Sequence, residues 1–336
     1  MTFTFRHIGA SLLAVAMMTA AIPASATEYR VAVGDGAGGT QEAFGKAFAE
    51  ALAEVSDGEM TARLFLNSQL GDEQATVTSA ATGTLDFSIL AAGNLAPFSP
   101  SVGTLTLPYV ILSQDEAEAV TQGELGQKLI DQTVEDAGVR IVGWAYAGFR
   151  VMTNSKRPVS TVADLQGLII RVPSNEIMID TYKSWGVNPT PMAWSETFAA
   201  LQQGVIDGQE NPYMTIYSVR FDEVQKHVTN LRYIFSIDPM IMSEALFQDL
   251  SPEEQEMVLE AGRRATDHAA DFLREEETRI QEELVERGME ITDPADDEKE
   301  FIELATTQVW PKYYDQIGGV EALNEVLTSL GRDPVE

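Results

Sequence analysis

Hydrophobic positions along this chain switch between two spacings, one typical of strands and one typical of helices. Residues 29–33 alternate as a strand does, residues 44–55 repeat apolar side chains at helical spacing, and residues 60–66 alternate again. A strand, a helix and a strand in this order are typical of α/β proteins. The opening of the chain therefore predicts an α/β fold.

The same two spacings predict further elements along the chain. Before residue 147 they are a helix over 73–81, a strand over 85–90, a helix over 116–137 that breaks at Gly123, and a strand over 139–146. The pattern changes at 148–150. After it come short strands at 151–153 and 168–172, helices at 175–185 and 195–203, and a strand at 228–235.

A long helix is expected towards the C-terminus. Ser251 is a favourable N-cap, Pro252 suits the first helical position, and the acids at 253 and 254 suit the first turn. Nothing breaks the helical pattern until Gly288, which gives about 38 residues or roughly 57 Å. One helix of that length runs along two domains, and two helices joined at a kink are the alternative. A last helix is expected over 320–330.

The first 26 residues have the composition of an export signal. Arg6 and His7 form a short basic start, residues 9–22 are apolar or small, and Ala24-Ser25-Ala26 has the A-x-A pattern of a cleavage site. The apolar run is shorter than the roughly 20 residues that span a bilayer. We expect cleavage after Ala26 and, in a Gram-negative cell, a periplasmic location. An uncleaved anchor or a buried helix is the alternative.

Charge and composition exclude several functions. The 336 residues include 52 acids and 22 Lys or Arg, a formal net charge of −30, which repels nucleic acids and anionic membranes. The absence of cysteine excludes disulfides, thiolate nucleophiles and iron–sulfur clusters. Three histidines are too few and too scattered for a histidine-rich metal site. We therefore expect neither a metal nor a nucleic-acid partner.

One glycine-rich turn raises an enzymatic alternative. Residues 34–39 (GDGAGG) follow a predicted strand, precede a predicted helix and fit the G-x-G-x-x-G pattern of dinucleotide-binding proteins. Nicotinamide cofactors are scarce outside the cytoplasm, and a glycine turn also lets a ligand approach the backbone. No serine lies in G-x-S-x-G and no H-E-x-x-H is present, so the sequence predicts no catalytic residues.

Two arginines are better candidates for a functional site than any acid. Arg171 ends the apolar run 168–170, so its guanidinium requires a partner, which is either an internal carboxylate or a bound anion. Arg150 lies in glycine-rich and apolar surroundings. Asn211 offers an amide to the same anion, unless it is only a turn residue. Trp194 either fills a core or forms the wall of a cleft.

Several segments resemble, in the same order, the motifs of DctP-type solute-binding proteins of TRAP transporters (tripartite ATP-independent periplasmic transporters). Residues 166–173 (QGLIIRVP) resemble the family's signature strand. Its longest motif is similar to residues 189–196 (PTPMAWSE), 199–204 (AALQQG) and 207–212 (DGQENP), and shorter matches occur at 69–72 (QLGD), 107–109 (LPY) and 148–150 (GFR). The resemblance covers essentially the whole chain after residue 26.

The resemblance implies a periplasmic binding-protein fold, in which two α/β lobes enclose a ligand cleft and one long helix packs along both. Lobe I would hold residues 27–149 with about 237–275, and lobe II residues 150–236 with about 276–336. Proteins of this kind close around the ligand by a hinge motion.

The resemblance also assigns roles to residues of lobe II. Arg171 is implied as the principal carboxylate anchor and Arg150 as a second basic contact. Asn211 is expected to hydrogen-bond the ligand, and Trp194 to pack against it.

Three ligand-binding features are implied in lobe I. One is a polar contact from Asp72 or Glu73. The second is Asn94, in the loop at the mouth of the cleft. The third is the glycine turn at 34–39, which would contact the ligand through its backbone.

The resemblance thus implies a monomeric receptor without a cofactor, which captures a small organic anion and hands it to the small and large TRAP membrane subunits. The candidate ligands are a C4-dicarboxylate, a sugar acid, a hydroxy or keto acid, and a short sulfonate. A zwitterion is also open, because Trp194 offers a cation–π face. The alternatives are an exported nicotinamide-dependent oxidoreductase that uses the 34–39 turn, and a sensor subunit that presents its ligand to a receptor kinase.

Overall fold

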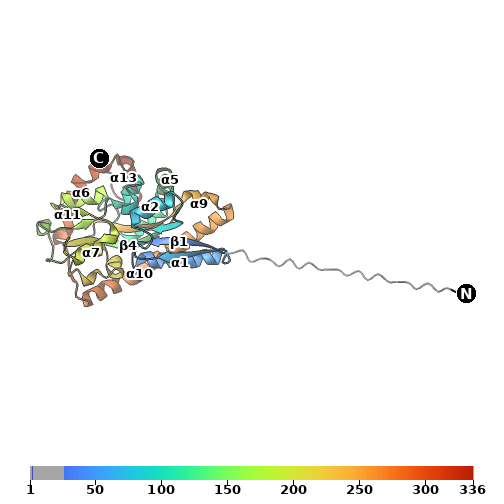
Figure 1. Ribbon diagram of the computed structural model, residues 1–336. Coiled ribbons are helices and arrows are strands. Elements are labelled where there is room, and N and C mark those ends of the chain that lie inside the picture. Colours follow the sequence, from blue (N-terminus) through green and yellow to red (C-terminus); the bar gives the residue numbers. More distant parts are fainter. Residues whose placement is uncertain (1, 3–25, 336) are drawn as a thin grey trace.

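The computed structural model describes residue 2 and residues 26–335, which form a mixed α/β protein (Figure 1). The expected export signal lies outside the described residues apart from positions 2 and 26. The strands are β1 (Thr27–Val33), β2 (Met60–Phe65), β3 (Phe87–Ile89), β4 (Val139–Asn154), β5 (Arg171–Val172), β6 (Thr190–Pro191), β7 (Gly208–Pro212), β8 (His227–Thr229), β9 (Phe235–Ser243) and β10 (Glu290–Thr292).

The helices of residues 26–335 confirm most of the helical predictions. They are α1 (Thr40–Val55), α2 (Glu73–Ala81), α3 (Ala92–Leu95), α4 (Gln114–Thr121), α5 (Glu124–Ala137), α6 (Glu176–Ser184), α7 (Trp194–Gln202), α8 (Tyr213–Ser218), α9 (Glu244–Asp249), α10 (Pro252–Glu286), α11 (Lys299–Gln308), α12 (Trp310–Tyr313) and α13 (Val320–Ser329). Short 3-10 helices lie at Pro100–Thr106, Val162–Leu165, Phe221–Glu223 and Ala295–Glu298. The expected break at Gly123 separates α4 from α5.

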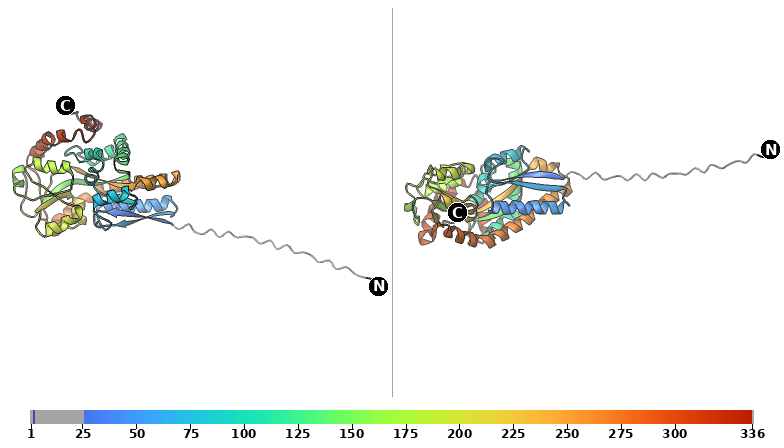
Figure 2. Two further views of the ribbon diagram at one scale, coloured as in Figure 1. Left: turned by 45° about the horizontal axis from the view of Figure 1, so that its top comes forward. Right: turned by 60° about the horizontal axis from the view of Figure 1, so that its bottom comes forward.

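One mixed sheet runs through the molecule. Its strand order is β10-β8-β4-β9-β3-β1-β2, and β7 joins it beside β4. The first part of β4 pairs with β9, and its last residues pair with β7 and β8. Figure 2 shows the early elements, in blue, at one end of the molecule and the yellow-green elements of the middle of the chain at the other. The strand β4 therefore belongs to both ends of the sheet.

The long helix is confirmed as a single element of 35 residues, α10, which excludes the two-helix alternative. Ser251 and Glu254 cap each other's backbone N–H groups at its start, as the sequence predicts. The first half of α10 packs on the core beneath β1, β2 and β3 through residues such as Val258 and Ala265. Its second half packs on a different core through Ile280 and Leu284. The helix thus runs along both ends of the sheet (Figure 1).

The helix α10 crosses β4 at two glycines. A Cβ atom on Gly262 would lie 1.8 Å from the Val142 carbonyl oxygen, and one on Gly143 would lie 2.9 Å from the Gly262 carbonyl oxygen. The pairing of β4 with β9 shifts register between Ile141 and Gly143. Beside this bulge the Trp144 N–H donates to Thr266 Oγ1 of α10 at 3.0 Å. Only glycine permits this approach of helix and strand.

Three strand predictions need correction. The pattern change at 148–150 does not end a strand, because β4 continues to Asn154 through a second bulge at Gly148, whose φ is +91°. The expected strand at 168–172 is reduced to the two residues of β5, which pair only with β6. The expected strand at 228–235 is two strands: β8, and the start of β9.

The C-terminal segment contacts residues that we assign to lobe I. The Trp310 indole N–H donates to the Pro108 carbonyl oxygen at 2.9 Å, and Lys128 of α5 forms an ion pair with Glu325 of α13. The lobe boundaries stay a prediction, and these contacts connect residues 310–335 to the first part of the chain. Among residues 26–335, no helix combines the length and the apolar composition that crossing a membrane requires.

Candidate ligand-binding site

A narrow polar cavity lies where the two ends of the sheet meet. Its walls come from the β1–α1 loop, α1, α2, α3 and β9 on one side, and from β5, α7, β7 and α8 on the other, with β4 between them. Six of the seven predicted ligand-binding residues line it: Arg171, Arg150, Asn211, Trp194, Glu73 and Asn94. About 20 Å³ of the cavity is open to the centre of a water molecule, so its walls must part before a larger ligand enters.

Arg171 has no acidic partner among the described residues. The residue is only 2% exposed, and its Nε and Nη2 both donate to the Met192 carbonyl oxygen, at 3.0 and 2.7 Å. The Trp194 ring centre lies 5.6 Å from its Cζ. Burial lowers the pKa of Arg171 to about 10, because a buried charge without a counter-ion is disfavoured. Its Nη1 is not used by any hydrogen bond of the described residues.

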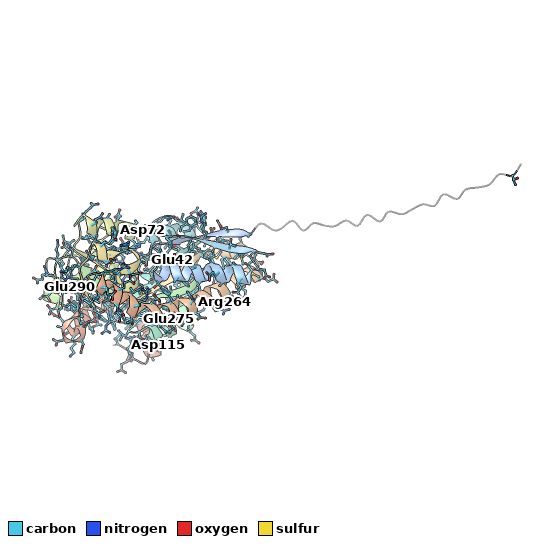
Figure 3. All side chains as sticks on the ribbon, turned by 90° about the horizontal axis from the view of Figure 1, so that it is seen from below. Glu42, Asp72, Asp115, Arg264, Glu275 and Glu290 are labelled. Atoms are coloured by element: carbon cyan, nitrogen blue, oxygen red, sulfur yellow. The ribbon has the colours of Figure 1, made fainter. Side chains whose placement is uncertain are left out.

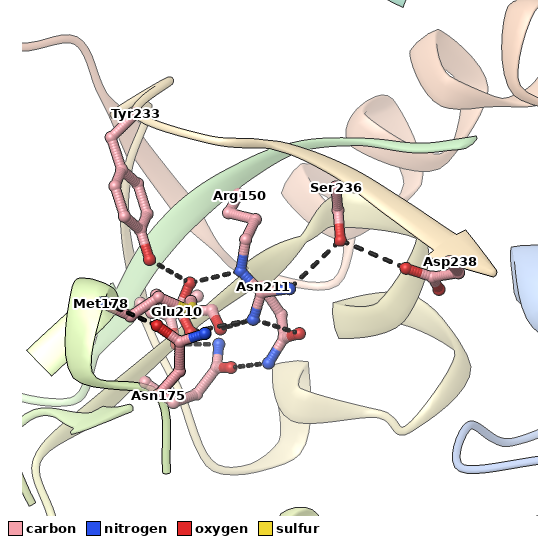
Figure 4. A network of polar contacts seen from close by, with 10 residues as sticks. Arg150, Asn175, Met178, Glu210, Asn211, Tyr233, Ser236 and Asp238 are labelled. Atoms are coloured by element: carbon pink, nitrogen blue, oxygen red, sulfur yellow. Dashed lines mark hydrogen bonds and ion pairs between the residues drawn. The ribbon is translucent and has the colours of Figure 1, made fainter. Parts of the chain in front are cut away.

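Arg150 is equally buried but fully engaged with the protein. Its Nε donates to Glu210 Oε2 at 2.5 Å and its Nη2 to Glu210 Oε1 at 2.8 Å, a bidentate ion pair shown in Figure 4. Further bonds run from Nη2 to Asn211 Oδ1 at 3.0 Å and from Nη1 to Ser236 Oγ at 3.2 Å. Burial disfavours the charge, but Glu210 outweighs this effect and raises the pKa of Arg150.

Asn211 is oriented by two neighbours. Its Oδ1 accepts from Arg150, and its Nδ2 donates to Gln209 Oε1 at 2.6 Å. Asn211 lies in β7, which pairs with the end of β4, so the register of these strands places it beside Arg150. It is therefore not merely a turn residue.

Of the two acids expected from lobe I, Glu73 lines the cavity and Asp72 does not. Asp72 caps α2 by accepting from the Gln74 N–H at 3.2 Å, and its other oxygen accepts from the Ser195 N–H at 3.3 Å. Glu73 is buried and accepts from Gln41 Nε2 at 3.1 Å and from Asn94 Nδ2 at 2.5 Å. Burial, reinforced by Asp238, raises the pKa of Glu73 to about 7.

Sequence reasoning missed five polar residues of the cavity: Asp35, Gln41, Thr215, Ser236 and Asp238. The glycine turn drew attention to its backbone, but its Asp35 side chain is what faces the cavity. Asp238 lies between Ile237 and Pro239 in a wholly buried strand. An acid inside such an apolar run is a signal that the sequence offers for a polar site.

Three of the backbone N–H groups of the glycine turn already have acceptors within the protein. The N–H groups of residues 34 and 35 both donate to Gln41 Oε1 at 3.1 Å, and the Gly38 N–H donates to Glu42 Oε2 at 2.7 Å. A Cβ on Gly36 would lie 2.6 Å from the Ser218 carbonyl oxygen, so this glycine allows close packing against α8. The turn therefore gives no support to the nicotinamide-dependent alternative.

Besides the bond from the Ser195 N–H to Asp72, further hydrogen bonds join the two sides of the molecule at or beside the cavity. The Trp194 indole N–H donates to the Gly34 carbonyl oxygen at 3.2 Å, Thr215 Oγ1 to Asp35 Oδ2 at 3.0 Å, Asn175 Nδ2 to the Gly93 carbonyl oxygen at 2.9 Å, and Gln74 Nε2 to the Ser174 carbonyl oxygen at 3.2 Å. These bonds hold the two walls together in this structure.

A family model for bacterial extracellular solute-binding proteins, family 7 (DctP), matches residues 36–317. The chain belongs to this family. It is also 31% identical over 270 residues to the 2,3-diketo-L-gulonate-binding periplasmic protein YiaO of Escherichia coli, covering 80% of this chain and 82% of that protein. Members of the DctP family are solute-binding proteins of the periplasm rather than enzymes.

Solved structures of family members have the same fold. A TRAP periplasmic solute-binding protein of Roseobacter denitrificans with bound L-galactonate superposes with a TM-score of 0.80 at 30% identity, covering 84% of this chain and 93% of that one. Another from Sulfitobacter, with bound β-D-galacturonate, gives 0.83 at 27% identity, covering 89% and 98%. The two-lobe DctP architecture expected from the sequence is thus confirmed.

Proposed function

We propose that this DctP-family protein is the periplasmic receptor of a TRAP transporter and captures a sugar acid, an aldonate or a uronate, by clamping its carboxylate on Arg171. The observation that carries the proposal is the buried guanidinium of Arg171, which faces the cavity with Nη1 unused and has no acidic partner among residues 26–335. A planar guanidinium fork matches a carboxylate in two parallel hydrogen bonds. A bound carboxylate supplies the missing counter-charge.

The rest of the cavity suits the hydroxyl groups of a sugar acid. Glu73 and Asn94 carry oxygens that accept from hydroxyls, and Gln41 lies between them and the glycine turn. The ligands named for the Roseobacter and Sulfitobacter proteins each combine one carboxylate with several hydroxyls. The described residues form no cluster of His, Cys, Asp and Glu with metal-binding geometry.

The surface charge means that affinity arises at short range. Acids such as Asp115, Glu275 and Glu290 are exposed over the face seen in Figure 3, and the whole chain carries a formal charge of −30. Such a surface does not steer an anion towards the protein. The Arg171 contact gains strength once the closing walls exclude water and lower the local dielectric constant. Closure re-forms the hydrogen bonds that join the two walls, such as the one from the Trp194 indole N–H to the Gly34 carbonyl oxygen.

In this proposal the signal is cleaved after Ala26, and the mature monomer releases its ligand to the TRAP membrane subunits. The first test measures thermal unfolding of residues 27–336 with a panel of aldonates, uronates, dicarboxylates, sulfonates, compatible solutes and nicotinamide dinucleotides. A ligand at about 1,000 times its Kd adds about 4 kcal/mol of stability, which raises the Tm by several degrees.

The variants Arg171→Ala and Arg171→Lys then test the clamp by titration calorimetry. Both should remain folded and lose affinity at least about 100-fold, because an ammonium group does not reproduce the fork. Arg263→Lys, a change at an exposed arginine of α10, is the matched control and should bind as the wild type does. Unchanged affinity in Arg171→Ala would refute the clamp. A panel that shifts only with nicotinamide dinucleotides would overturn the receptor function.

A further inference from the structure

The acidic groups of the cavity are concentrated on the wall opposite β5. Asp35, Glu73 and Asp238 come from the β1–α1 loop, α2 and β9, and each is at most 4% exposed. Arg150 is committed to Glu210, so Arg171 is the remaining cation of the cavity. With every acid ionised, the cavity would hold two arginines against four carboxylates.

A single amide joins two of the three acids. Gln41 Nε2 donates at 3.1 Å both to Glu73 Oε1 and to Asp238 Oδ2, and the Thr215 hydroxyl donates to Asp35 Oδ2. Asp238 also accepts from Ser236, whose hydroxyl is contacted by Arg150 (Figure 4). The three carboxyl groups are thus held in place by neutral donors and do not form ion pairs.

Burial is the main cause that raises the pKa of each of the three acids, and their mutual repulsion adds to it for Asp35 and Glu73. The charged groups that oppose this repulsion are Arg150 for Asp35 and Asp238, and Arg171 at longer range for Glu73. At a pH above the raised pKa values of these acids, a further negative charge on this side would meet like charges in a medium of low dielectric constant. A ligand hydroxyl, by contrast, donates a hydrogen bond to any of these oxygens.

We propose that Asp35 and Asp238, together with Glu73, are specificity-determining residues that admit a hydroxyl-rich ligand with one carboxylate and reject a ligand with a second carboxylate. This inference rests on the proposed function, because it takes the first carboxylate to bind Arg171. It narrows the anions left open by the sequence to monocarboxylates and excludes C4-dicarboxylates and aldarates.

The test compares pairs of ligands that differ only in the oxidation of the terminal carbon: galactonate with galactarate, gluconate with glucarate, and erythronate with meso-tartrate. Calorimetry on the wild type should give at least about 100-fold tighter binding of the aldonate in the pair that binds best, because opposed like charges cost several kcal/mol. Asp238→Asn and Asp35→Asn should each lower the ratio of aldonate affinity to aldarate affinity about tenfold or more. The ratio should also shrink as the pH falls from 8 to 5, since protonated acids no longer repel.

Glu50→Gln is the matched control, because it removes one negative charge from an exposed position of α1, the helix that carries Gln41. It should leave the ratio unchanged. Circular dichroism confirms that each variant is folded, and if one aspartate variant does not fold, the other carries the test. An unchanged ratio in a folded aspartate variant, or an aldarate that binds as tightly as its aldonate, refutes the selectivity proposal while the sugar-acid receptor stands. Galacturonate and glucuronate give the same two aldarates when their C1 is oxidised, so each also serves as the monocarboxylate of a pair. If no aldonate or uronate binds the wild type, both proposals fail.

Discussion

The surroundings of the two buried arginines differ in one respect that separates structure from function. Arg150 is 4% exposed and forms a bidentate pair with Glu210, whereas Arg171 is 2% exposed and contacts only a carbonyl oxygen and an aromatic ring. Burial acts on both guanidinium groups, yet the pKa rises for Arg150 and falls for Arg171. Burial of an arginine therefore does not by itself indicate a ligand. Burial without a carboxylate partner is the feature that indicates a site for an anionic ligand.

Removing the two arginine charges one at a time tests whether only Arg150 has a structural counter-charge. Arg150→Met leaves Glu210 buried without a cationic partner, with only the Tyr233 hydroxyl donating to it, and should lower the free energy of unfolding by about 3–5 kcal/mol, measured with urea. Arg171→Met removes a charge that has no partner and should lower it by about 1 kcal/mol or less. Adding Glu210→Gln to Arg150→Met should restore part of the lost stability. Equal losses in the two single variants would show that Arg171 has a structural partner after all.

Glu73 is the cavity acid that could serve as an ion-pair partner of Arg171, and its pKa indicates that it does not. An ion pair with Arg171 would hold the pKa of Glu73 below 4.5, but burial raises it to about 7. The folded protein then binds a proton more readily than the unfolded chain. The resulting stability is fully present below about pH 4.5 and is lost as the pH rises through about 7.

Glu73→Gln should therefore lose less stability than the wild type between pH 5 and pH 8, by on the order of 2 kcal/mol. Urea unfolding at several pH values measures the difference. Glu50→Gln again serves as the control and should follow the wild-type pH profile. A profile for Glu73→Gln that runs parallel to that of the wild type between pH 5 and pH 8 would mean that Glu73 is ionised throughout this range and paired.

The smallest expected effect concerns the aromatic neighbour of Arg171. Trp194→Phe keeps a ring beside the guanidinium but removes the indole N–H that donates across the cavity to Gly34. One lost hydrogen bond of about 1 kcal/mol should weaken ligand affinity by about fivefold. Trp310→Phe removes a comparable bond, to Pro108, away from the cavity, and should lower stability without changing affinity. Equal losses of affinity in both variants would contradict a specific role for Trp194.

Much of the fold was predictable because its signals are local. The capping residues at 251–254 and the unbroken helical pattern up to Gly288 predict α10 nearly to its ends. The bulge at Gly148 was not predictable in the same way. In the sequence, a glycine at this point indicates the end of a strand. Only the pairing of β4 with β9 and β7, which are distant in sequence, shows that the strand continues.

The candidate site was predictable where motifs mark it. Arg171, Asn211 and Glu73 lie in or beside segments that resemble the DctP family, and all three line the cavity. The pairing of Arg150 with Glu210 depends on the register of two strands about 60 residues apart, which no local pattern reveals. Asp238 was missed for a similar reason. It reaches the cavity because β9 returns between β3 and β4, and its neighbours in sequence are apolar.

The position of β9 between β3 and β4 also constrains how the chain folds. The sheet stays open between these two strands until residue 243 has been made, although β3 and β4 come much earlier in the chain. Contacts between such distant segments slow folding, and an open strand edge invites pairing with other chains. The export signal that we propose for residues 1–26 adds a use for this delay. A sheet that closes slowly leaves the chain unfolded for longer, which favours passage across a membrane over premature folding.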